Sequence, residues 1–159
     1  MTELTKIEEK DYPLLYDFMY QSWMDTYKHI IKISHIEFLL HKFFDADNAA
    51  KYAAEGYMHY YITDNGEKVG LIVYHDRGEE IYLDKFYVLE PYKGKGYASF
   101  AMNYLKGFGK DITLSVNRDN VNSISIYKHF GFFVDKIVDT QIGDDMINGD
   151  YIMRCKAQK

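Results

Sequence analysis

The segment between Val88 and Ala98 limits the fold more than any other part of the sequence. An apolar run ends at Val88, a loop with two glycines follows, and a helical pattern begins near Tyr97. A strand that leads into a helix through a loop predicts an α/β domain. The first amides of such a helix lack internal partners and carry partial positive charge. Because Gly94 and Gly96 let a ligand approach this backbone closely, the segment predicts a diphosphate site.

Charge around this loop agrees with an anionic ligand. Residues 91–110 contain four lysines and no acidic residue, whereas the whole chain has a net charge of -5; the lysines are Lys93, Lys95, Lys106 and Lys110. A plain glycine-containing connection is the alternative interpretation. The spacing matches neither the Walker loop nor the dinucleotide fingerprint, because the residues that each motif requires are missing.

Hydrophobic periodicity predicts a mixed α/β domain with a central sheet. The pattern predicts strands at 3–8, 57–63, 69–75, 80–88, 111–116, 132–138 and 150–155, and helices at 11–27, 34–44, 47–56, 97–108 and 120–130. Residues 64–67, Asp-Asn-Gly-Glu, predict a tight turn between two strands. Ser34 and Glu37 match a capping box. Asn120 or Asn122 is expected to cap the last helix.

Composition narrows the class of protein. The 159 residues, 47% of them hydrophobic, predict one globular domain spanning 1–159. Cys155 is the only cysteine, so an internal disulfide is excluded. With no secretory signal pattern and no membrane-spanning stretch, we expect a cytoplasmic protein. The acidic balance argues against nucleic acid as a partner, and the six histidines have no metal-binding spacing, so no metal is expected.

A second segment, Leu114–Phe132, completes a recognisable pattern. Asn120 is followed seven residues later by Tyr127, and Gly131-Phe132 closes the predicted helix. Together with Lys93-Gly94-Lys95-Gly96-Tyr97-Ala98, it resembles the GNAT superfamily of N-acetyltransferases. One departure is Lys93, where the family usually has Arg or Gln.

The resemblance implies a GNAT-like fold and an acetyl-CoA co-substrate. That fold, α/β or α+β in class, has a mixed, mostly antiparallel sheet of six to seven strands, a splayed parallel pair and four to five flanking helices. The pantetheine arm would fill the splay, and the backbone N–H near Val88 would meet the thioester oxygen. The implied cofactor-binding residues are Val88, Lys93, Gly94, Lys95, Gly96, Tyr97, Ala98, Asn120 and Tyr127.

Acetyl transfer to an amine also needs an acid and a base. Tyr127 occupies the family's tyrosine position, so we expect it to protonate the leaving thiolate. The amine must lose a proton, since an alkylamine is almost wholly protonated at pH 7. Strand alternation predicts that Asp84 shares one face of its strand with Tyr82, Phe86 and Val88. The resemblance implies that this face looks toward the acceptor cleft. Asp84 is therefore the candidate base or amine anchor, with Glu79, Glu80 and a water relay as alternatives.

The predicted first helices would form the acceptor wall. Trp23, Asp25 and Tyr27 form an aromatic and acidic cluster that could hold an alkylammonium group, so Trp23, Tyr27 and Asp84 are the candidate substrate-binding residues. The segment 23–44 and the ending 149–153 are faintly similar to bacterial polyamine N-acetyltransferases. The sequence thus predicts acetylation of a primary amine, such as a polyamine or another small cationic amine.

Two other functions stay open at this point. A protein or peptide N-acetyltransferase would need an open groove where a polyamine enzyme needs a deep acidic pocket. A non-catalytic acyl-CoA-binding module would use the same loop without Tyr127 as an acid. A homodimer is also left open.

Overall fold

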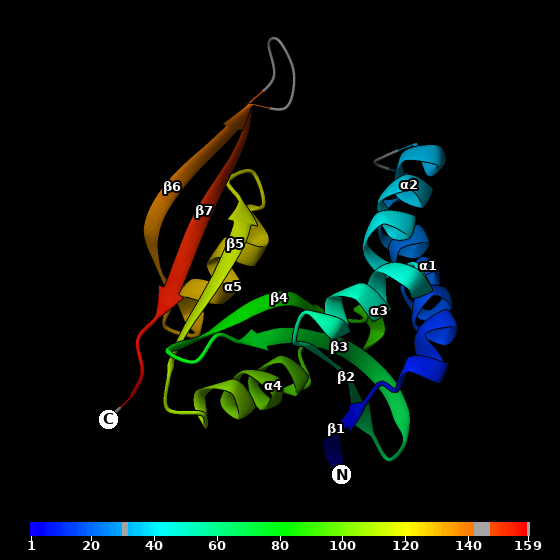
Figure 1. Cartoon of the computed structure of the whole chain (residues 1–159), viewed down its shortest axis with the longest axis horizontal. Coiled ribbons are helices and arrows are strands. Elements are labelled where there is room, and N and C mark those ends of the chain that lie inside the picture. Colours follow the sequence, from blue (N-terminus) through cyan, green and yellow to red (C-terminus); the bar gives the residue numbers. More distant parts are fainter. Residues whose placement is uncertain (30–31, 142–146, 159) are drawn as a thin grey trace.

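A computed structural model describes residues 1–29, 32–141 and 147–158; within these ranges the side chains of 25, 26, 140, 141, 147 and 148 are not described. Seven strands form one sheet in the order β1-β2-β3-β4-β5-β7-β6 (Figure 1). The strands are β1 Thr2–Lys6, β2 Tyr57–Asp64, β3 Glu67–Asp76, β4 Glu80–Val88, β5 Asp111–Asn117, β6 Phe133–Gln141 and β7 Ile147–Cys155. The helices are α1 Tyr12–Tyr27, α2 Ile33–Phe44, α3 Ala46–Ala54, α4 Tyr97–Lys106 and α5 Val121–His129.

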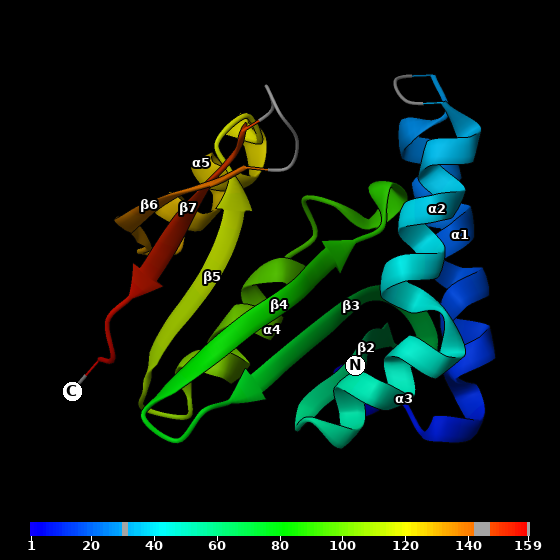
Figure 2. The same cartoon turned by 45° about the horizontal axis from the view of Figure 1, so that its top comes forward.

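The parallel pair β4–β5 is the feature that positions the site. The two strands pair only at Glu80–Asp111, Ile81–Ile112 and Tyr82–Thr113, and Figure 2 shows them diverging toward their carboxyl ends. The other strand pairs are all antiparallel. This arrangement confirms the predicted mixed, mostly antiparallel sheet with a splayed parallel pair and five flanking helices.

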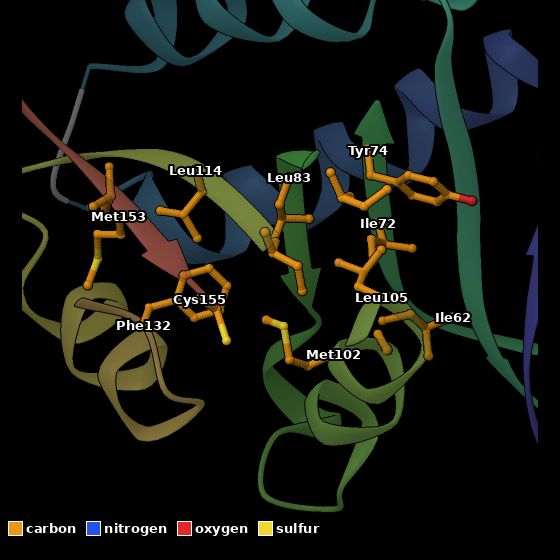
Figure 3. Close-up of a cluster of buried hydrophobic side chains, with 14 of the residues drawn as sticks. Ile62, Ile72, Tyr74, Leu83, Met102, Leu105, Leu114, Phe132, Met153 and Cys155 are labelled. Atoms are coloured by element: carbon orange, nitrogen blue, oxygen red, sulfur yellow. The ribbon is translucent and has the colours of Figure 1, made fainter. Parts of the chain in front are cut away.

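Two hydrophobic cores cover the two faces of the sheet. On one face, α4 contributes Ala101, Met102 and Leu105 to a cluster that runs from β2 to β7 (Figure 3). On the other face, α1, α2 and α3 pack over β2, β3 and β4 through a separate cluster that includes Leu15, Leu40 and Phe44. The amphipathic spacing of the helices buries one stripe of each against the sheet. The sheet therefore separates a helical layer containing α4 from a layer containing α1–α3.

A β-bulge at Asp84 corrects the predicted alternation of β4. Val73 pairs with Lys85 and Tyr74 pairs with Leu83, so Asp84 is the extra residue on β4. An extra residue reverses the side-chain alternation beyond it. Phe86 and Val88 consequently pack against the α4-side core, whereas Tyr87 packs against the α1–α3 core. The prediction that Tyr82, Asp84, Phe86 and Val88 share one face is therefore wrong.

The structure confirms some of the predicted caps, turns and strand ends and corrects others. Asn120 caps α5, since its side chain accepts from the Ser123 N–H at 3.3 Å. The capping box at Ser34 is wrong, because α2 begins one residue earlier and its N-cap is Lys32. The turn at 64–67 is confirmed, with φ of 51° at Asn65 and 85° at Gly66. The last two strands run longer than predicted, because β6 and β7 pair from Phe133–Arg154 to Gln141–Ile147.

Candidate active site

The mouth of α4 presents unpaired backbone amides. The first backbone bond of the helix joins the Phe100 N–H to the Gly96 carbonyl at 3.0 Å. Within the residues that the structure describes, the amides of 94–99 donate to no backbone carbonyl. Unpaired amides and a partial positive charge at a helix end are the features that bind anions in proteins, so this mouth is the candidate diphosphate site.

Both loop glycines adopt a conformation that other residues disfavour. Gly94 has a φ of 78° and Gly96, the N-cap of α4, has a φ of 89°. A Cβ built on either would meet no atom within 4 Å. The glycines are thus required by backbone conformation and leave open space over the amides.

The four lysines of residues 91–110 differ in their partners. Lys106 Nζ donates to the Phe130 carbonyl at 2.7 Å, and Lys110 pairs with Asp76 at 2.8 Å. Lys93 pairs with Glu90 at 2.8 Å. Lys95 lies over the ring of Tyr92, 5.8 Å from its centroid. The positive charge available to a diphosphate therefore comes chiefly from Lys95 and the backbone.

Tyr127 lies beside the diverging end of β4. Its ring is 6.5 Å from that of Phe86 on β4 and 5.7 Å from that of Phe132. Burial raises the pKa of Tyr127 to about 12, because the phenolate is poorly solvated there. The phenol is therefore protonated throughout the physiological pH range, as a general acid requires.

A small aromatic pocket adjoins the end of β4. Its volume is about 70 Å³, and it is lined by Ser22, Trp23, Tyr27, Tyr87, Val88, Glu90 and Lys93. The Trp23 ring packs edge-on against Tyr27, Phe44 and Tyr87. Its Nε1 is buried without a hydrogen-bond partner among the described residues. Trp23 and Tyr27 are thus brought together with Val88 and Lys93. Asp25 belongs to α1, but its side chain is not described.

Tyr87 and Glu90 are pocket residues that sequence reasoning missed. Burial raises the pKa of Tyr87, and the nearby phenols of Tyr27 and Tyr127 raise it further. The Tyr87 hydroxyl is therefore within electrostatic reach of both the pocket and the candidate acid. Its place next to Val88 was visible in the sequence, but the bulge that turns it toward α1 was not.

Asp84 lies apart from this pocket. Its carboxylate accepts from Lys85 Nζ at 3.0 Å, and the two side chains are only 20% and 13% exposed. Lys85 also lies 4.6 Å from the ring centroid of Phe43 on α2. An ammonium group thus already occupies the position that an acceptor amine would take beside Asp84.

The remaining candidates are placed as follows. Asn120 caps α5 with its side-chain oxygen, so that atom is engaged. Glu80 lies eight residues from Val88 on β4, about 26 Å at the usual rise per residue. There, Glu79 and Glu80 line a larger cavity of about 550 Å³ with Arg77, Asp111 and Arg154. Because this cavity lies at the paired end of β4, away from the candidate phosphate loop (residues 93–98), neither glutamate is suited to act as the base.

A match to a family model shows to which protein family this chain belongs. The model described as the acetyltransferase (GNAT) family matches residues 16–132, well over half of the chain. The chain belongs to the GNAT acetyltransferase family. Its members are acyl-CoA-dependent N-acetyltransferases that use acetyl-CoA as co-substrate, so the expected enzyme class and co-substrate are confirmed. No curated protein sequence matches this GNAT chain significantly.

Solved structures agree with the fold. PaiA N-acetyltransferase from Thermoplasma acidophilum, in complex with coenzyme A, has a TM-score of 0.73 and 21% identity over 98% of this chain and 99% of that one. The ribosomal-protein-S18-alanine N-acetyltransferase of Escherichia coli has a TM-score of 0.70 and 19% identity, over 100% and 96%. A spermidine N-acetyltransferase SpeG chimera from Vibrio cholerae and hSSAT has a TM-score of 0.63 and 16% identity, over 98% and 95%.

Two features are absent from the described part of this GNAT protein. No helix among the described residues combines the length and apolar character needed to cross a membrane. Across 1–29, 32–141 and 147–158, no group of three or more His, Cys, Asp or Glu side chains is arranged to hold a metal ion.

Proposed function

We propose that this enzyme acetylates the primary amine of a small cationic acceptor, such as a polyamine. The aromatic pocket beside Val88 is the observation that carries the proposal. Trp23, Tyr27 and Tyr87 supply rings that attract an ammonium group by cation–π interaction, and Glu90 adds a carboxylate. The pocket is small, with a volume of about 70 Å³, so it suits the narrow end of a substrate. An unbranched aminomethyl group fits this space better than the branched α-amine of an amino acid.

The same pocket joins the proposed acceptor site to the cofactor site. Val88 and Lys93 line it together with Trp23 and Tyr27. An amine held there lies at the open end of β4, where we assign the thioester of acetyl-CoA. Attack forms the new C–N bond and breaks the C–S bond. A backbone N–H near Val88 stabilises the carbonyl oxygen as it gains negative charge.

Proton transfers complete the proposed reaction. The Tyr127 hydroxyl protonates the leaving thiolate, and the proton that the attached nitrogen loses as it becomes an amide returns through water to the phenolate. The acceptor ammonium loses its proton to Asp84 or to water. If Asp84 accepts this proton, the acceptor must compete with Lys85 for the Asp84 carboxylate, because Lys85 and Asp84 form an ion pair at 3.0 Å.

Acetylation of a peptide amine is the second candidate. Two structural neighbours favour it: the E. coli enzyme named for the alanine of ribosomal protein S18, and Arabidopsis thaliana Naa50 in complex with the bisubstrate analogue CoA-Ac-MVNAL. Naa50 has a TM-score of 0.62 and 19% identity over 96% of this chain and 97% of its own. Against it stands the size of the pocket, which suits an unbranched amine.

A thiol-release screen with acetyl-CoA separates these candidates. We expect linear diamines and polyamines to give the highest kcat/KM, above amino acids and peptides with free N-termini. Peptides as the best substrates would replace the proposal with the second candidate. Coenzyme A binding without turnover on any amine would favour a binding module.

A further inference from the structure

We propose that the turn between β2 and β3 positions the phosphate loop for coenzyme A through two tyrosines. The Tyr97 hydroxyl donates to Asp64 Oδ2 at 2.6 Å. The Tyr92 hydroxyl donates to Glu67, on the other side of the same turn. This inference rests on the proposed binding of the cofactor phosphates at residues 94–99. Asp64 and Glu67 are thus positioning residues, which act on the cofactor through the loop.

The two tyrosines flank the most adaptable part of the loop. Only four residues, 93–96, lie between them, and all four are exposed. Two of these are glycines with positive φ and open space around them. Because such residues lose much conformational freedom when they are ordered, a ligand that orders them binds more weakly. Fixing both ends of the segment before the ligand arrives reduces that cost.

The turn itself is held rigidly enough to serve as an anchor. Asp64 and Glu67 are directly paired at the end of the β2–β3 ladder, with Asn65 and Gly66 in the left-handed conformation between them. The Leu89 N–H, just before the loop, donates to the Val69 carbonyl of β3 at 2.9 Å. The loop is therefore tied to the same hairpin at three points, on both sides of the glycines.

Charge alone predicts the opposite effect for this turn. The hydrogen bond from Tyr97 lowers the pKa of Asp64, so the carboxylate is ionised at neutral pH. A carboxylate near a diphosphate repels it, and removing that charge should strengthen binding. Removing the anchor should weaken binding. The sign of the change in coenzyme A affinity therefore separates positioning from electrostatics.

The experiment measures coenzyme A binding by calorimetry and steady-state kinetics on the full chain. Asp64→Ala removes both charge and acceptor, whereas Asp64→Asn removes the charge but keeps an oxygen that accepts from Tyr97. Tyr97→Phe removes the donor alone. Tyr104→Phe is the matched control, because Tyr104 is on the same helix and its hydroxyl bonds that of Tyr74 at 3.0 Å, away from the loop.

We expect Asp64→Ala and Tyr97→Phe to weaken coenzyme A binding about tenfold, the usual scale for one hydrogen bond to a charged group. The KM for acetyl-CoA should rise while kcat at saturation stays unchanged. The coenzyme A affinities of Asp64→Asn and Tyr104→Phe should stay within about twofold of the wild type.

Binding by Asp64→Ala or Tyr97→Phe as tight as the wild type, or tighter, would overturn the inference. If Asp64→Ala does not fold, Tyr97→Phe decides. Failure of the wild type to bind coenzyme A would instead overturn the phosphate site itself.

Discussion

The two candidate sites, on opposite faces of the sheet, differ in how they are built. On the α4 side, the candidate phosphate site consists mainly of backbone: the unpaired amides at the mouth of α4 and two glycines with positive φ. On the α1–α3 side, the candidate acceptor pocket consists of side chains from α1, β4 and the turn after β4. A backbone site recognises a feature common to one cofactor, whereas a side-chain pocket can change its specificity by substitution. Substitutions in the pocket can therefore change which acceptor is recognised while the recognition of the co-substrate stays the same.

The largest expected effect concerns Tyr127, which packs against Phe86 at the diverging end of β4. Tyr127→Phe should lower kcat by about 100-fold or more, within the range for one general acid, because the phenol is the proposed proton donor to the thiolate. The ring contacts with Phe86 and Phe132 remain, so thermal stability and coenzyme A affinity should be unchanged. Unchanged kcat would remove Tyr127 as the acid.

The pH profile gives an independent test of the same group. Burial raises the pKa of Tyr127 from 10.0 to about 12, so the acid form persists to higher pH than an exposed phenol would allow. We expect no fall in wild-type kcat from this ionisation below about pH 11. A descending limb near pH 10 that is lost in Tyr127→Phe would show that the phenol is solvated.

The second-largest expected effect tests the candidate phosphate site at the mouth of α4. Gly96→Val should weaken coenzyme A binding by about 30-fold or more, since valine resists the left-handed conformation and its side chain would project over the amides. Gly78→Val is the matched control, because Gly78 has a φ of 91° and equally open surroundings at a distant turn. Both variants should lose similar stability in thermal unfolding. Equal coenzyme A affinities would place the phosphates elsewhere.

A smaller effect separates chemistry from folding at the bulge. Asp84→Asn and Lys85→Gln each break the same partly buried ion pair, so both should lower stability. If Asp84 accepts the proton from the amine, only Asp84→Asn should also lower kcat, by about tenfold or more. Equal kcat values for the two variants would leave the proton to a water relay.

The smallest effect tests the mouth of the acceptor pocket. Glu90→Gln should raise the KM for a diamine by about two- to threefold, because an exposed carboxylate attracts a cation weakly. The KM for acetyl-CoA should not change, and the diamine effect should shrink at high salt. A larger effect on acetyl-CoA than on the diamine would assign Glu90 to the cofactor side, through its ion pair with Lys93.

Sequence by itself determined the features that depend on neighbouring residues. The order of strands and helices, the turn at 64–67 and the cap at Asn120 all follow from local periodicity and side chain–backbone bonding. The glycines of the strand–glycine–helix connection before α4 are local in the same way, because the positive φ of Gly94 and Gly96 is a preference of these residues themselves. For that reason the fold and the family could be predicted before the structure, whereas the roles of individual site residues stay predictions.

Only the tertiary structure decided which distant side chains meet. The bulge at Asp84 depends on how β4 pairs with β3, and it turns Tyr87 rather than Phe86 toward Trp23. The partners of Lys106 and Lys110 come from other elements, so the charge that the sequence places near the loop is largely used elsewhere. The tyrosine anchors of the loop likewise join residues about 30 positions apart. Such contacts depend on three-dimensional packing, which local periodicity does not encode.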